Sequence, residues 1–149
     1  MKTFEKRVSR FVFTNRMKTD MLFYGTINNC DFYGNSYFFG RLSDNFFDKS
    51  KFKEVALSKI VKDFMIEPGD DKLVEPNYNI AKGDKGLTLV NFKISYDSNH
   101  APIEEATCNY NYYKLFEKDC CYIYDTKSIL CLYDERKSLI GFIAKIVNI

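Results

Sequence analysis

The chain has 149 residues, of which 46% are hydrophobic and 28% charged, and its formal net charge is +2. These proportions argue against a disordered chain, and the length fits a single domain, residues 1–149, with one hydrophobic core. No apolar run approaches the roughly 20 residues that cross a bilayer, and no secretory signal is recognisable. We therefore expect a cytoplasmic protein with no membrane association, in which the cysteines stay reduced.

Alternating residues in the N-terminal part predict strands. Val8–Thr14 alternates Phe with Arg, Val and Thr, and it is predicted to be a first or edge strand. Met21–Ile27 and Ser36–Leu42 are predicted to form a hairpin, because Asn, Asp and Gly between them favour turns. A bulge is predicted near Asp31–Tyr33.

One principal helix is predicted at about residues 49–66. Apolar residues recur there at helical spacing and leave a lysine-rich opposite face, and Pro68-Gly69 would end the helix. Residues 67–86 are rich in turn formers and charges, and they are predicted to form a long loop.

Strands continue to the end of the chain. The short polar connections between them predict an antiparallel meander, and the last strand is apolar on both faces, which favours a central position. The sequence thus predicts an α+β fold with mainly antiparallel sheet, about six to eight strands in all, packed with the helix at about residues 49–66. The strands predicted in this half are Leu87–Tyr96, Thr107–Phe116, Cys121–Tyr124, Ser128–Tyr133 and Leu139–Val147.

Few side chains suit catalysis. His100 is the only histidine, and an enzymatic reading would pair it with a cysteine nucleophile such as Cys108. Cys120 and Cys121 are adjacent, which does not fit the usual spacing of zinc ligands. We therefore expect no cofactor and no bound metal, and we take an enzyme with a Cys/His site as the least favoured function.

Positive charge is concentrated at the start of the chain. Residues 1–18 carry six basic residues and one acidic residue, 6 − 1 = +5, so the remaining 131 residues carry 2 − 5 = −3. Basic side chains interleaved with phenylalanines could grip a phosphate backbone while rings stack on bases. Lysines and arginines that merely protect an edge strand explain the same pattern. The candidate nucleic-acid-binding residues are Lys6, Arg7, Arg10, Arg16 and Lys18.

Tyrosines cluster with asparagines in residues 31–39 and 109–113. Tyrosine and asparagine suit binding surfaces, because rings give contact area at small entropic cost and amides give directional bonds. In an alternating strand, however, half of the rings point into the core. The candidate partner-binding residues are Tyr33, Tyr37, Tyr110 and Tyr112.

These observations favour a small non-enzymatic module that binds another protein and blocks it sterically. Nucleic-acid binding through the basic N-terminal segment is the main alternative. The many residues with AT-rich codons indicate a low-GC genome, and this adds the hypothesis of a phage or mobile-element protein of the anti-defence type.

Overall fold

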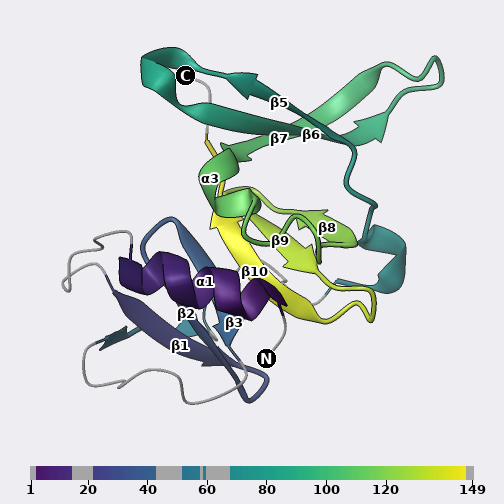
Figure 1. The fold of residues 1–149 in the computed structure, drawn as a ribbon. Coiled ribbons are helices and arrows are strands. Elements are labelled where there is room, and N and C mark those ends of the chain that lie inside the picture. The colour runs from purple at the N-terminus through teal and green to yellow at the C-terminus, as the bar shows by residue number, and fades with distance from the viewer. Residues whose placement is uncertain (1–2, 15–21, 43–51, 58, 60–67, 147–149) are drawn as a thin grey trace.

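The computed structural model describes residues 3–14, 22–42, 52–57, 59 and 68–146, and it contains two sheets (Figure 1). The large sheet has seven strands in the order β4-β1-β2-β3-β10-β9-β8, and the small sheet has three in the order β5-β6-β7. Every pairing is antiparallel except that between β1 and β4. The predicted α+β class with mainly antiparallel sheet is therefore confirmed. The strands are β1 Phe23–Ile27, β2 Cys30–Gly34, β3 Phe38–Leu42, β4 Lys53–Glu54, β5 Tyr78–Lys82, β6 Thr88–Tyr96, β7 Pro102–Asn109, β8 Tyr122–Asp125, β9 Ile129–Tyr133 and β10 Leu139–Ala144.

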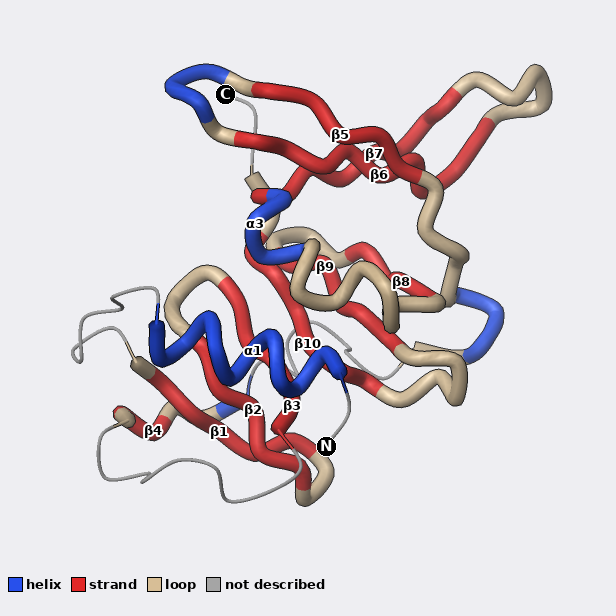
Figure 2. Tube along the Cα trace, viewed as in Figure 1, coloured by secondary structure: helices blue, strands red, loops and turns tan. Residues whose placement is uncertain are grey.

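The N-terminal segment is a helix, α1 Thr3–Thr14, which lies across the large sheet (Figures 1 and 2). The predicted strand at Val8–Thr14 is therefore wrong. A seven-residue window alternates by chance, whereas Phe4, Val8 and Phe11 recur at the spacing of one helix face. Val8 is fully buried and packs on Gly40, where a Cβ atom would lie 2.9 Å from its methyl groups.

The region of the predicted first hairpin contains three strands. Asn28 and Asn29 adopt positive φ angles of 52° and 65°, which asparagine tolerates, and they form the tight turn between β1 and β2. Strand β2 therefore replaces the predicted bulge near Asp31–Tyr33. The turn between β2 and β3 is closed by Asn35, whose side-chain oxygen accepts the backbone amides of Tyr37 and Phe38 at 2.7 and 3.1 Å.

The start of the predicted helix at residues 49–66 is wrong, because part of its first half is a strand. Lys53 and Glu54 form β4, an exposed strand parallel to β1, and of the residues described in this segment Leu57 and Lys59 are helical. Leu57 is buried, as the predicted apolar face requires. Residues 49–51, 58 and 60–66 lie outside the described part of the chain.

The middle of the chain also differs from expectation. Strand β5 lies inside the segment 67–86, for which the sequence predicts a loop, and it pairs with β6. Strand β6 itself confirms the predicted strand Leu87–Tyr96. The predicted strand Thr107–Phe116 is wrong beyond Asn109, where the short helix α3 Tyr110–Tyr113 begins. The side chain of Asn109 accepts the amide of Asn111 at 2.9 Å and so caps this helix.

The predicted C-terminal meander is confirmed by β8, β9 and β10. Strand β10 lies in the interior of the large sheet, paired with β9 on one side and β3 on the other. Gly40 of β3 stands opposite Gly141 of β10, and the ring of Phe116 packs on both. This close approach of a ring to two strands requires residues without a Cβ atom.

The small sheet packs on the large one through α3 and the segment after it, with Phe92, Cys108 and Tyr113 in the shared core. Glu117 links the two parts. It accepts hydrogen bonds from the hydroxyls of Tyr78 in β5 and Tyr110 in α3, at 2.6 and 2.7 Å. Among the described residues, no helix is both long and apolar enough to cross a membrane.

Candidate functional site

The four predicted tyrosines occupy different environments. Tyr33 is fully buried in β2, where its ring meets Phe52 edge-on at 5.2 Å, so it cannot contact a partner in the folded protein. Tyr110 is half-buried and its hydroxyl is turned toward Glu117. Only Tyr37 and Tyr112 come together near the surface.

Tyr37 and Tyr112 form the outer part of a stack of three rings. Their rings are nearly parallel, with centroids 6.4 Å apart and an angle of 11° between them. Tyr112 stacks in turn on Phe38, at 4.9 Å and 20°, and Phe38 is buried. The stack therefore extends from the core to Tyr37, which is 52% exposed.

The backbone holds Tyr37 in place. Its amide is bound by the Asn35 side chain, and its carbonyl oxygen accepts the amide of Ala144 at 2.8 Å. An exposed ring carried by a hydrogen-bonded backbone loses less conformational entropy on binding than one on an unbonded loop.

A groove of about 440 Å³ lies beside these rings. Its charged member is Lys145, whose ammonium group lies 2.7 Å from a carboxylate oxygen of Asp125 and donates to the carbonyl of Thr126 at 2.8 Å. The positive charge of the lysine is therefore balanced by the carboxylate. The rest of the groove surface consists of rings, aliphatic groups and an amide. The groove, called the tyrosine groove below, is lined by Tyr37, Asn109, Tyr112, Ala144, Lys145 and Ile146.

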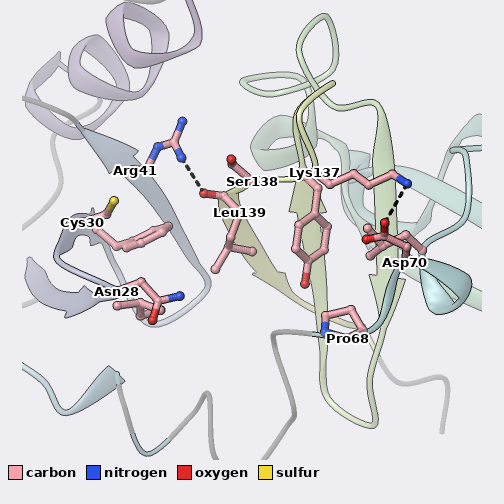
Figure 3. Close-up of a pocket in the computed structure, with 12 residues that line it drawn as sticks. Asn28, Cys30, Arg41, Pro68, Asp70, Lys137, Ser138 and Leu139 are labelled. Carbon is pink, nitrogen blue, oxygen red and sulfur yellow. Dashed lines mark hydrogen bonds and ion pairs between the residues drawn. The ribbon is translucent and has the colours of Figure 1, made fainter.

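A second cavity, of about 400 Å³, lies between the β1–β2 turn and the β9–β10 turn (Figure 3). Its two cations are directed to protein partners: Arg41 donates to the carbonyl of Leu139 at 3.2 Å, and Lys137 pairs with Asp70 at 3.4 Å. Both cations are thus occupied, and this arrangement points to no particular ligand. The remaining walls are Ile27, Asn28, Cys30, Phe32, Pro68, Leu73, Tyr133 and Ser138.

The basic N-terminal residues do not act as one surface. Arg7 is part of the fold, because its guanidinium group donates to the carbonyl of Leu115 at 2.8 Å and pairs with Asp119 at 2.6 Å. Lys6 and Arg10 are both exposed, and four residues apart on a helix they lie on one face. Arg16 and Lys18 lie outside the described residues.

The enzymatic pair of Cys108 and His100 cannot form within one chain. His100 is exposed in the turn between β6 and β7, whereas Cys108 lies 108 − 102 = 6 residues from the start of β7, a length of about 20 Å at about 3.4 Å per residue. Cys108 is fully buried, and this burial raises the pKa of its thiol to about 12. A nucleophilic cysteine needs a lowered pKa, so its environment acts in the opposite direction.

Burial also acts against a reactive thiol at Cys120. Burial raises the pKa of Cys120 to about 12, and Cys120 lies in the core as a small apolar residue, while its neighbour Cys121 is half-buried. Within the described ranges, no three His, Cys, Asp or Glu side chains are grouped so that they could hold a metal ion.

Comparisons with known proteins give no relative. No protein-family model, curated protein or solved structure matches the chain.

Proposed function

We propose that this protein is a small non-enzymatic module that binds another protein through the tyrosine groove and acts by covering part of that partner's surface. The observation that carries the proposal is Tyr37, an aromatic side chain 52% exposed, fixed in position and stacked on Tyr112 at the rim of the groove. The AT-rich codon composition supports the finer hypothesis of a cytoplasmic inhibitor of the anti-defence type from a phage or mobile element.

Ring chemistry gives the reason why this surface suits a protein partner. Tyrosine supplies a large apolar face and a hydroxyl for a hydrogen bond, and aromatic anchors of this kind dominate the energetics of many interfaces. The groove beside the ring can accept a partner side chain, while Asn109 in its lining offers the NH₂ group of its amide, since its oxygen caps α3. Truncation of a central anchor costs about 2 kcal/mol or more, which corresponds to a loss of affinity of roughly 30-fold.

The test is capture of a partner from the lysate of a low-GC bacterium, followed by measurement of its affinity for single variants. Tyr37→Ala is expected to weaken binding by roughly 30-fold. Tyr96→Ala is the matched control, because Tyr96 is 39% exposed on the β6–β7 hairpin and does not line the groove. Equal affinities for both variants and the unmodified protein, with all three folded by circular dichroism, would remove the groove as the binding surface.

Nucleic-acid binding remains the second candidate because Lys6 and Arg10 are exposed on one face of α1. This function predicts that the double change Lys6→Ala with Arg10→Ala weakens oligonucleotide binding. The salt dependence should also flatten, by roughly 0.7 in the slope of log K against log salt for each lost contact with a single strand. An unchanged salt slope would eliminate this candidate.

A further inference from the structure

We propose that two copies of this chain associate through strand β5, the outer strand of the small sheet, to form one continuous antiparallel sheet. This surface is distinct from the tyrosine groove. Four of the five residues of β5 are exposed, and Ile80 at its centre is 46% exposed. An exposed edge strand with an exposed aliphatic side chain is a template for pairing with another strand.

The other described sheet edges are protected. Strand β4 is only two residues long, and both residues are charged. Strand β8 is covered by Val74, which exchanges two backbone hydrogen bonds with Ile123 at 2.8 and 3.0 Å. Strand β7 begins with Pro102, carries the exposed residues Glu104 and Glu105, and is bonded by the amide of Ile146 through the carbonyl of Thr107. In β5 the sequence is Tyr-Asn-Ile-Ala-Lys, which contains no proline and no acidic residue.

The hydrogen bonds of β5 define which backbone groups are available. The carbonyl of Asn77 accepts from Lys93 and the amide of Gly83 donates to Leu87, so odd-numbered residues direct their polar groups toward β6. The amides and carbonyls of Tyr78, Ile80 and Lys82 therefore point away from the sheet. Among the described residues, no strand lies beyond them and none of their backbone groups has a bond on that side.

Pairing of two β5 strands about a two-fold axis at Ile80 would give these outward amides and carbonyls hydrogen-bond partners. Antiparallel pairing then sets Ile80 against Ile80 and each Lys82 against Tyr78 of the second copy, which gives three hydrogen-bonded pairs with two bonds in each, 3 × 2 = 6 bonds. The two exposed Ile80 side chains are directly opposite and cover one another.

Charge is complementary in the same register. Tyr78, Ile80 and Lys82 share one face, and on that face the Tyr78 hydroxyl is bonded to the carboxylate of Glu117. Lys82 of one copy therefore approaches the ring of Tyr78 and the acidic Glu117 of the other. The two Lys82 residues are four positions apart along the pair, about 14 Å, which exceeds the screening length of about 8 Å at physiological salt.

The strand is short, so the expected dimer is weak and reversible. A contact of five residues on each copy lies below the roughly 1,000 Å² of a stable specific interface. The proposal therefore predicts dissociation on dilution and a measurable dimer only at high concentration.

The test is sedimentation equilibrium from about 10 µM to about 1 mM, a range that covers weak dissociation constants. The unmodified protein is expected to shift from monomer to dimer across this range. Ile80→Lys is expected to abolish the dimer, since it places two ammonium groups directly opposite, while its exposure leaves the fold intact. A second variant, Ile80→Pro, removes an outward amide without removing a bond to β6, and it should have the same effect.

Ile103→Lys is the matched control, because Ile103 is 63% exposed but lies on β7. It should dimerise like the unmodified protein, and Tyr37→Ala should too. A monomer at every concentration would overturn the proposal, as would a dimer that survives both changes at Ile80. A dimer lost equally with Ile103→Lys or with Tyr37→Ala would also overturn it, since the contact would then lie elsewhere.

Discussion

Arg7 fastens α1 to the segment after α3, and its removal should cost a defined amount of stability. The side chain makes one bond to the carbonyl of Leu115 and one ion pair with Asp119. Hydrogen bonds to charged groups contribute about 1.5–3 kcal/mol when buried, but these two side chains are 26% and 30% exposed, so solvent screens part of that energy. For Arg7→Ala we expect a loss of about 2 kcal/mol in the free energy of unfolding.

The corresponding change in melting temperature follows from the size of the chain. At about 2.1 cal/mol/K per residue, 149 residues give an unfolding entropy of about 0.3 kcal/mol/K, so a loss of 2 kcal/mol lowers Tm by about 6 °C. Urea denaturation and calorimetry measure both quantities. Lys6→Ala is the control on the same helix, because Lys6 is exposed, and it should change the free energy by less than about 0.5 kcal/mol.

A double-mutant cycle of Arg7→Ala with Asp119→Asn isolates the ion pair, and we expect a coupling energy of about 1 kcal/mol. The reasoning is refuted if Arg7→Ala costs no more than Lys6→Ala. It is also refuted if Arg7→Ala leaves stability unchanged and weakens oligonucleotide binding instead, because Arg7 would then belong to a nucleic-acid surface.

Three further outcomes test the core. Gly141→Ala should lower the free energy of unfolding, measured in urea, by about 1–3 kcal/mol, because a Cβ atom would stand 2.6 Å from the carbonyl oxygen of Phe39. Gly69→Ala is the control and should cost less, because its Cβ atom would meet only a flexible carboxylate. Burial, followed by the hydrogen bond to Glu117, raises the pKa of Tyr78 to about 12 from 10, so its contribution to stability is complete below pH 10 and is lost between pH 10 and 12. Alkaline unfolding curves should therefore be less steep in that interval for Tyr78→Phe, and identical curves would contradict the assignment. Burial raises the thiol pKa to about 12 in Cys108, Cys120 and Cys131. These three thiols should therefore resist a thiol reagent at pH 8 until guanidinium unfolds the protein. Immediate reaction of all five cysteines would contradict their burial.

Much of the sheet could be predicted from local pattern. Strands β6, β8, β9 and β10 alternate over several residues or are bounded by clear turns, and they lie where the sequence places them. The errors fall where a short segment fits both the two-residue period of a strand and the 3.6-residue period of a helix. Val8–Thr14 satisfies strand alternation, but Val8 is buried against Gly40 only when the segment is a helix over the sheet.

The candidate site was predicted only in part, for a topological reason. Alternation indicates that half of the clustered tyrosines face inward, but it cannot tell which half until the register is known. Tyr33 lies within β2 and faces the core, whereas Tyr37 lies in the turn after it and faces outward. Asn109 and Lys145 of the tyrosine groove are 145 − 109 = 36 residues apart, and neither carries a local signal that it lies beside Tyr37.

The pairing of β3 with β10 has a consequence for the order in which the protein can acquire its structure. Gly40 and Gly141 are 141 − 40 = 101 residues apart, and Arg7 is separated by 108 residues from Leu115, whose carbonyl accepts its hydrogen bond. During synthesis α1 therefore leaves the ribosome long before the segment that binds Arg7, whereas Gly40, on which Val8 packs, follows it within a few tens of residues. Closure of such long loops is entropically costly, so we expect the contacts between the first and the last third of the chain to form later than those within β1, β2 and β3.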